Sequence, residues 1–478
     1  MFPLKSQYLL NFTSSIGELR DITSPNDLLP FAKVQFGTAE DTEKILSLVK
    51  SGQKKMRAVS ASEKIRILKG VASEIGKNAD QLALLIAREG GKPLKDAIVE
   101  VTRAKDTFEI CAEECWRLHG ETIPMDRTES GKGHLSFTTR EPIGPVLAIS
   151  AFNHPLNNLA HQTATAIAAG NMVVLKPSSA TPVTAFILEE MFRRAGLPAE
   201  CMMVFTASTE QVEKLLTSPA FAFVGFIGSA KVGWEMRRKI ASGTRISMEH
   251  GGQAAAILRE DADLREAIPQ LLRSSFYHAG QVCISTQRIF IHRNIFEVFK
   301  NEFVQRAKKL KTGTAMDETT EVGPLIRPEE VVRIKKEIDE AVKRGGKLLC
   351  GNEVQGNAKQ FLTPTVLADV PRDSSIMMNE AFGPVVCLNS FEDEEELVNY
   401  LNTNEFPFEA CLYTHDIKAA LNLSQKISTM TMVVNNHNAI RVDWMPFGGH
   451  GLAGLGMGGV KYAIEEMTKL KQVIIKLS

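Results

Sequence analysis

Apolar strands and helices alternate without interruption between Gly144 and Glu249, and this alternation constrains the fold more than any other feature of the chain. Connections of helix length join parallel strands by right-handed crossovers, and the helices then cover both faces of the sheet. The expected strands are Gly144–Ser150, Met172–Lys176, Cys201–Phe205, Phe221–Phe226 and Arg245–Glu249, with helices near 158–169, 182–195, 209–216 and 230–241. The pattern predicts a doubly wound parallel α/β sheet, whose ligands bind beyond the carboxyl ends of the strands.

A helical N-terminal part and a second α/β unit flank this sheet. Residues 38 to 118 have helical periodicity, with a break at Gly90–Pro93. Thr181 is predicted to cap the helix near 182–195, and Gly196 to end it. The second unit runs from Ala254 to about Arg441 and has expected strands at Ala255–Leu258 and Arg288–His292, a helix from Asp263, and helices near 295–310, 328–343 and 394–402.

Two further strands have no obvious place in either unit. Polar and apolar residues alternate from Ser136 to Pro142, which indicates a half-exposed, hairpin-like strand. The closing segment Lys471–Leu477 is an apolar strand with nothing left nearby in the chain to pair with. Because an unpaired apolar edge favours association, this tail predicts a partner.

Composition excludes several classes of function. Lysine plus arginine and aspartate plus glutamate both number 56, so the net charge of zero gives no footprint for nucleic acid or an anionic membrane. The N-terminus lacks a signal-like apolar region, and no run approaches the ~18 apolar residues of a membrane span. Seven scattered cysteines form no disulfide framework. We therefore expect a cytoplasmic protein that binds neither nucleic acid nor a membrane.

Cys111, Cys115 and His119 recur every four residues and could line one face of a helix. Three such ligands on successive turns of a straight helix span too much length to close a tetrahedral metal site by themselves. The pattern is more typical of a helix face directed at the core, so we predict no metal.

Three polar residues at the edges of these elements are candidates for catalysis. Cys283 lies in a small, glycine-flanked stretch, and it would need a helix start or a neighbouring base to be ionised near neutral pH. Glu249 ends a predicted strand 34 residues earlier, and Asn153 follows another strand 130 residues before the cysteine. A thiol, a carboxylate and an amide donor are the groups needed for acyl-type chemistry at a carbonyl. A buried structural cysteine is the alternative for Cys283 alone.

Seven segments, in this order, resemble the aldehyde dehydrogenase superfamily over nearly the whole chain. They are residues 148–156 around Asn153, Lys176-Pro177-Ser178-Ser179, Gly228-Ser229 with Gly233, residues 247–253 around Glu249, residues 276–285 around Cys283, Glu380-Ala381-Phe382-Gly383-Pro384-Val385, and Pro446-Phe447-Gly448-Gly449. The chain departs from the family pattern at His250, where a leucine is usual, and at His450–Gly454, where a lysine and a Ser-Gly pair commonly follow.

The resemblance implies an aldehyde dehydrogenase-like fold with three parts. Residues 1–120 and 142–250 would form a Rossmann-like cofactor-binding domain, and residues 251–448 an α/β catalytic domain. Residues 121–141 and 460–478 would form a small β flap that joins a neighbouring subunit, in a homodimer or homotetramer. The implied cofactor is NAD or NADP, and the implied binding residues are Ile149, Lys176, Ser178, Ser179, Gly228, Ser229, Val232, Gly251, Glu380 and Phe382.

The resemblance also implies a mechanism. The Cys283 thiolate would attack an aldehyde, and the Asn153 amide and the Cys283 backbone N–H would hold the oxyanion. After hydride transfer, Glu249 would activate the water that hydrolyses the thioester to a carboxylate. The alternatives are transfer of the acyl group to coenzyme A, which enzymes with a glutamate at position 249 do not usually perform, and a catalytically idle binding or structural protein.

Single residues narrow the choice between NAD and NADP and the class of aldehyde. Relatives that prefer NAD often carry a glutamate at the position of Ser179, so we expect NADP to be accepted here. The stretches 152–157 and 280–285 look most like the lactaldehyde and phosphonoacetaldehyde dehydrogenase branch. His161, Arg103 and Arg441 would then give the substrate tunnel a polar wall that suits a small polar or anionic aldehyde. The alternative is that Arg103 pairs with Glu100 or Asp106, and Arg441 with Asp443.

Overall fold

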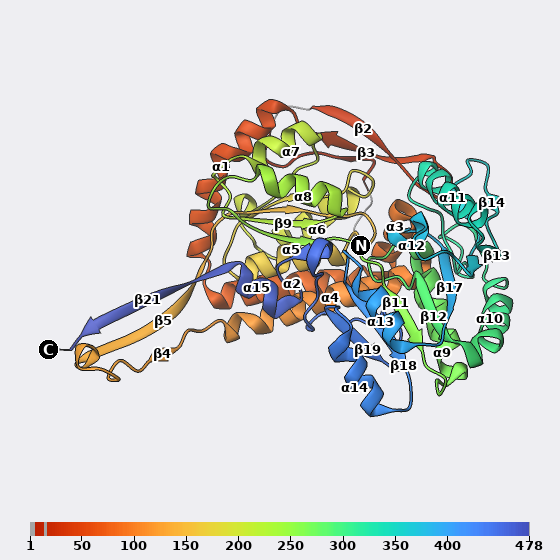
Figure 1. Cartoon of the computed structure of the whole chain (residues 1–478). Coiled ribbons are helices and arrows are strands. Elements are labelled where there is room, and N and C mark those ends of the chain that lie inside the picture. Colours follow the sequence, from red (N-terminus) through yellow and green to blue (C-terminus); the bar gives the residue numbers. More distant parts are fainter. Residues whose placement is uncertain (1–4, 14–16, 478) are drawn as a thin grey trace.

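The computed structural model describes residues 5–13 and 17–477, and a six-stranded sheet forms the centre of its N-terminal half (Figure 1). The strand order is β20-β10-β9-β6-β7-β8, and every pair is parallel except β10 with β20. The strands are β6 (Val146–Ile149), β7 (Val173–Lys176), β8 (Met202–Val204), β9 (Phe223–Ile227), β10 (Arg245–Glu249) and β20 (Gly454–Leu455). The predicted doubly wound α/β class is confirmed.

Helices connect these strands as the sequence predicts. They are α5 (Asn157–Ala168), α6 (Val183–Arg194), α7 (Thr209–Leu216) and α8 (Ala230–Lys239). The predicted cap of α6 is wrong: Thr181 makes no cap, and the Glu89 carboxylate accepts hydrogen bonds from the Val183 and Thr184 backbone N–H groups at 2.5 and 3.2 Å. Glu89 belongs to another helix, so no local pattern could indicate this cap.

The N-terminal part contains four helices and a small sheet. The helices are α1 (Ala39–Ala58), α2 (Ala61–Lys77), α3 (Ala79–Gly90) and α4 (Leu94–Arg117), and the break at Gly90–Pro93 is where the sequence predicts it. Capping boxes begin α1 at Thr38 and α2 at Ser60. Before α1, strands β1 (Gln7–Tyr8), β2 (Glu18–Thr23) and β3 (Pro30–Phe36) form a sheet that we did not predict.

The second α/β unit is built on a seven-stranded sheet with the order β13-β16-β17-β12-β11-β18-β19. Its strands are β11 (Ala255–Leu258), β12 (Arg288–His292), β13 (Lys347–Cys350), β16 (Thr365–Ala368), β17 (Val385–Phe391), β18 (Glu409–Tyr413) and β19 (Thr431–Val434). Its main helices are α9 (Leu264–Phe276), α10 (Arg293–Ala307), α11 (Pro328–Lys343), α13 (Glu394–Asn402) and α14 (Ile417–Lys426). Each of the two large sheets has its own apolar core.

The C-terminal tail is paired within the chain, contrary to our expectation. Strand β21 (Thr468–Lys476) runs antiparallel to β5 (His134–Pro142), which also pairs with β4 (Thr122–Ile123). These strands project from the body of the molecule as an arm (Figure 1). Helix α15 (Val460–Glu466), which precedes β21, packs instead into the first core.

Cys111 and Cys115 of α4 are buried in the first apolar core, and Cys115 Sγ lies 3.4 Å from the Cys111 carbonyl oxygen. Helix α4 ends at Arg117, so His119 does not share their face. Within the described residues, no group of three His, Cys, Asp or Glu side chains could hold a metal ion. None of the described helices is long and apolar enough to cross a membrane.

Candidate active site

Cys283 sits in a tightly turned loop directly after α9. His278, Ala279 and Gly280 all have positive φ, at 48°, 54° and 71°, so the chain reverses sharply before the cysteine. A Cβ at Gly280 would overlap the Gly383 carbonyl, which explains why only glycine fits there. The Ser285 hydroxyl donates to the Ser274 and Ser275 carbonyls at 3.1 and 3.3 Å. These contacts hold Cys283 in place at the wall of a cavity.

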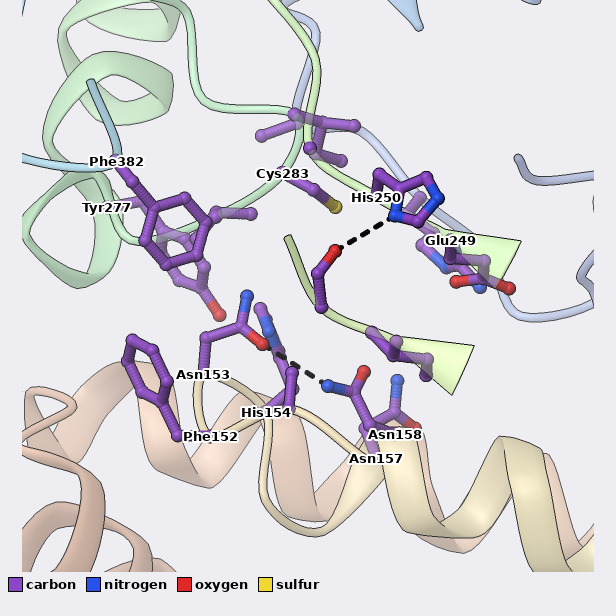
Figure 2. Close-up of a pocket in the computed structure, with 18 of the residues that line it drawn as sticks. Phe152, Asn153, His154, Asn157, Asn158, Glu249, His250, Tyr277, Cys283 and Phe382 are labelled. Atoms are coloured by element: carbon purple, nitrogen blue, oxygen red, sulfur yellow. Dashed lines mark hydrogen bonds between the residues drawn. The ribbon is translucent and has the colours of Figure 1, made fainter. Parts of the chain in front are cut away.

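Asn153 approaches the cysteine loop from the carboxyl end of β6. Its Nδ2 donates to the Gln281 carbonyl at 3.0 Å, and its Oδ1 accepts from Asn158 Nδ2 at 3.2 Å. This second bond fixes the orientation of the amide, so that the NH2 group faces the cysteine loop. Figure 2 draws the hydrogen bond from Asn158 to Asn153. Because an NH2 group has two N–H donors, one of them remains for a ligand after the bond to the Gln281 carbonyl.

Glu249 ends β10 and lies on the other side of the cavity. Its carboxylate packs against Gly458, where a Cβ would overlap Glu249 Oε1, and it points away from the Cys283 sulfur (Figure 2). The side chain must therefore rotate before it can act on anything bound to Cys283.

The surroundings of Cys283 disfavour ionisation of its thiol. Burial raises the pKa of Cys283 well above its usual range, the Arg441 charge lowers it, and the Glu249 charge raises it further. Burial also raises the pKa of Glu249, again opposed by Arg441. The sequence led us to expect a helix start or a base beside the thiol; the structure has instead a nearby guanidinium.

A cavity of about 630 Å³ joins these residues. Cys283, Asn153 and Glu249 line it together with His161, Arg103 and Arg441, so all six predicted catalytic and substrate residues meet there. Of the predicted cofactor residues, Ser178, Gly228, Ser229, Gly251, Glu380 and Phe382 line the same cavity. Ile149, Lys176, Ser179 and Val232 are not among the lining residues, although all four lie at or just beyond the strand ends or in the first turn of α8.

Two features of the cofactor side suit a dinucleotide. Glu380 Oε1 is buried and has no hydrogen-bond partner among the described residues, so it can accept from a ribose hydroxyl. In α8, no described side chain caps the N-terminus at Ser229, which leaves N–H groups for a pyrophosphate. Burial raises the pKa of Glu380 to about 8 and lowers that of Lys176 to about 8, so neither side chain has a polar partner that offsets its burial. The residues present therefore fit NAD or NADP.

His250, where the sequence departs from the family pattern, lies beside this cofactor region. Its Nδ1 is 3.2 Å from the Gly228 carbonyl, so that nitrogen carries the proton. The ring packs between Phe226 and Trp234, and a Cβ at Gly233 would overlap it. Gly233 thus makes room for the imidazole.

The predicted substrate residues share one partner, Asp443. Arg103 donates to both carboxylate oxygens at 3.1 and 2.7 Å, and His161 Nε2 lies 2.7 Å from Oδ1. Arg103 therefore pairs with Asp443 rather than with Glu100 or Asp106. Arg441 pairs with Asp443, as the alternative had it: Arg441 Nε and Asp443 Oδ1 form an ion pair at 3.8 Å, which is too long for a hydrogen bond. Burial would raise the pKa of Asp443, but the hydrogen bond and charge of His161, together with Arg103, lower it well below its usual value.

The sequence analysis missed several residues that line the cavity: His154, Asn157, Asn158, Arg273, Tyr277 and His437. Arg273 stands in the last turn of α9, ten residues before Cys283, and this closeness in sequence was a usable signal. His437 follows β19 and reaches the cavity only through the folding of the second sheet. No periodicity or motif indicated it.

The parallel α/β sheet ends at a cavity that brings a thiol, an amide donor and a carboxylate together beside residues suited to a dinucleotide, which is the arrangement of an enzyme that acts on a carbonyl group with a nucleotide cofactor. A model of the aldehyde dehydrogenase family matches residues 12–473. The chain therefore belongs to the aldehyde dehydrogenase family, and it is an NAD(P)-dependent oxidoreductase that acts on the aldehyde group.

Relatives and solved structures extend over almost the whole chain. The 3-sulfolactaldehyde dehydrogenase of Priestia aryabhattai is 36% identical over 449 residues, 94% of this chain and 93% of the relative. The lactaldehyde dehydrogenase of Methanocaldococcus jannaschii is 35% identical over 460 residues, 95% of this chain and 97% of the relative. The crystal structure of aldehyde dehydrogenase 21 from Physcomitrella patens, in complex with the reaction product succinate, has a TM-score of 0.95 at 34% identity and covers 99% of this chain and 98% of its own.

A fourth similarity bears on the cofactor. The glyceraldehyde-3-phosphate dehydrogenase of Methanocaldococcus jannaschii, complexed with NADP, has a TM-score of 0.91 at 34% identity. The match covers 95% of this chain and 98% of that structure. These similarities support the predicted resemblance to the lactaldehyde dehydrogenase branch.

Proposed function

We propose that this protein oxidises a short polar aldehyde to its carboxylate, with Cys283 as nucleophile. The observation that carries the proposal is the convergence of Cys283 and the oriented Asn153 amide on one cavity. The Cys283 sulfur adds to the aldehyde carbon, and the resulting oxyanion accepts hydrogen bonds from Asn153 Nδ2 and the Cys283 backbone N–H. NAD(P)+, when bound, supplies the acceptor for the hydride that leaves this carbon.

Loss of hydride leaves a thioester on Cys283. Glu249 rotates from its place beside Gly458, takes a proton from water, and the hydroxide attacks the thioester carbon. The C–S bond then breaks, so that a carboxylate leaves and the thiol is restored. Its raised pKa makes Glu249 a stronger base than an exposed glutamate once it is ionised. This hydrolytic base argues against the acylating alternative.

An assay of short aldehydes with both cofactors tests the proposal. We expect NAD(P)H and carboxylate to form in equal amounts without coenzyme A. A requirement for coenzyme A, or an absence of reduced cofactor with every aldehyde, would reject it.

We expect the choice of cofactor to depend on position 179. Ser179 places no charge beside the adenosine ribose, so the 2′-phosphate of NADP+ can be accepted. Ser179→Glu should raise the KM for NADP+ at least tenfold while changing that for NAD+ much less. Steady-state kinetics with a saturating aldehyde measure this, and equal changes in both constants would place the ribose elsewhere.

We also propose that the arm formed by β4, β5 and β21 joins a second copy of the chain, as a homodimer or homotetramer. Its support is the set of exposed apolar side chains on β21 and just beyond it: Leu470, Ile474, Ile475 and Leu477. A cytoplasmic location agrees with the seven unpaired cysteines, all of which lie in the described part of the chain.

A further inference from the structure

A carboxylate from another helix holds the segment that carries Asn153. Residues 150–156 connect β6 to α5, and Leu156 stands at the N-cap of α5, where its apolar side chain cannot accept a hydrogen bond. Glu100 Oε1, from α4, accepts instead from the backbone N–H groups of Leu156 at 2.8 Å and Asn157 at 3.1 Å. Because the first N–H groups of a helix have no partner within it, this carboxylate fixes where α5 begins.

The other oxygen of Glu100 is bound by a buried lysine. Glu100 Oε2 accepts from Lys92 Nζ, and the side chains of both residues are 0% exposed. Burial lowers the pKa of Lys92, and the Glu100 charge opposes this shift. The two oxygens therefore have separate partners, the lysine on one and the start of α5 on the other. A buried ion pair adds little stability compared with apolar side chains of the same size, so stability alone does not account for it.

The first turn of α5 carries this position on to the amide of Asn153. Asn158, in that turn, donates from Nδ2 to Asn153 Oδ1 at 3.2 Å (Figure 2), and its backbone N–H donates to the His154 carbonyl at 3.0 Å. Asn153 Nδ2 donates in turn to the Gln281 carbonyl at 3.0 Å, in the loop of Cys283. Hydrogen bonds and one turn of helix thus connect the buried ion pair to the amide that faces the cysteine loop.

We propose that Glu100 is a positioning residue for the oxyanion site: it sets where α5 begins, and thereby where the Asn153 amide stands when the Cys283 sulfur adds to an aldehyde. Lys92 neutralises the Glu100 charge and holds its carboxylate in place. Neither Glu100 nor Lys92 is among the residues that line the cavity, so both act through residues that do. A donor stabilises an oxyanion at about 2.7–3.1 Å, so a small shift of α5 weakens that bond. This inference rests on the proposed addition of Cys283 to an aldehyde.

Two double variants test the role of the acceptor at position 100. Lys92→Met/Glu100→Gln removes both charges but keeps a side-chain carbonyl that can accept from the start of α5, whereas Lys92→Met/Glu100→Leu has no acceptor. Both lack the lysine, so any effect of its contact with the Tyr277 ring, 5.9 Å from the ring centroid, is common to them. We expect the first variant to keep kcat within about threefold of wild type, and the second to be at least about tenfold slower than the first. Equal kcat in the two would overturn the inference.

The same two variants on an Asn153→Ala background show whether the effect passes through the amide. Asn153→Ala alone should lower kcat about a hundredfold or more, because it removes an oxyanion donor. With the amide gone, Glu100 has no donor to position, so the two double variants should then have kcat values within about twofold of each other. The same tenfold difference with and without Asn153 would mean that position 100 acts on the fold in general, and it would overturn the inference.

Glu89 provides a matched control. It is a buried glutamate of α3 that accepts from the first N–H groups of α6, as Glu100 of α4 does for α5. Helix α6 carries none of the three proposed catalytic residues. Glu89→Gln should lower the melting temperature, and it should change kcat by the same factor whether or not Asn153 is present.

Circular dichroism melting curves identify a variant that fails to fold. If Lys92→Met/Glu100→Leu did so, Glu100→Asp would test the same point, because it keeps a charge opposite Lys92 but withdraws the acceptor from α5 by one methylene. It should slow turnover at least about threefold with Asn153 present and leave it unchanged on the Asn153→Ala background; any other result would overturn the inference. Full activity of Asn153→Ala, or a wild-type enzyme that oxidises no short aldehyde, would instead count against the proposed function.

Discussion

Replacing Cys283 by alanine is expected to lower aldehyde-dependent turnover by at least about a thousandfold, because no other group in the site can form the covalent intermediate. Asn153 and Glu249 line the same cavity but hold no nucleophile of comparable strength. The fold should survive. The cysteine side chain keeps solvent contact through the cavity, so removing its sulfur creates no closed void and costs no more than about 1 kcal/mol of stability.

A second cysteine provides the control. Cys350 in β13 is also partly exposed and lies outside the cavity, where its thiol contacts the Pro364 carbonyl at 3.9 Å. Cys350→Ala should keep full turnover, and both variants should melt near the wild-type temperature. If Cys283→Ala retained more than about a thousandth of wild-type kcat, another nucleophile would have to be sought.

The parts of the fold that sequence predicts well are those in which local pattern and burial agree. Strands β6, β7 and β8 are buried on both faces, so they appear as continuous apolar runs between helices. Most residues of strand β2 are exposed, and its sequence is typical of a polar loop. It forms a strand through pairing with β3. The tail β21 was recognised as a strand, but its partner β5 lies more than three hundred residues earlier, and no local signal carries that pairing.

The residues of the site fall into the same two groups: those that the sequence indicates and those that only the folded structure brings together. Cys283, Asn153 and Glu249 could be selected because each follows a recognisable segment that resembles the family. The role of Asp443 could not, because it depends on Arg103 and His161 arriving from two different helices. Arg441 reaches the same carboxylate only as a longer ion pair, at 3.8 Å, because Arg103 and His161 already bind it. Such competition for a partner is a property of the packed structure.

The second large effect is expected from Glu249→Gln, which should separate hydride transfer from hydrolysis. Glutamine has nearly the same shape but cannot take a proton from water, while Cys283 and Asn153 are untouched. We expect a rapid burst of about one equivalent of reduced cofactor per site, followed by turnover at least about a hundredfold slower than wild type. Rapid-mixing absorbance measurements resolve the two phases, and mass spectrometry should find the acyl group on Cys283.

The pH dependence gives an independent check of this role. Burial raises the folded-state pKa of Glu249, so its basic form is lost as the pH falls through that raised value, and wild-type hydrolysis should slow accordingly. The acid limb of the rate profile should vanish in Glu249→Gln.

Glu409 is a matched control, since it is a buried carboxylate whose charge also reaches Cys283 but which does not line the cavity. Glu409→Gln should not separate burst from turnover. Loss of the burst itself in Glu249→Gln would instead assign Glu249 to activating the thiol, because the first chemical step would then depend on its carboxylate.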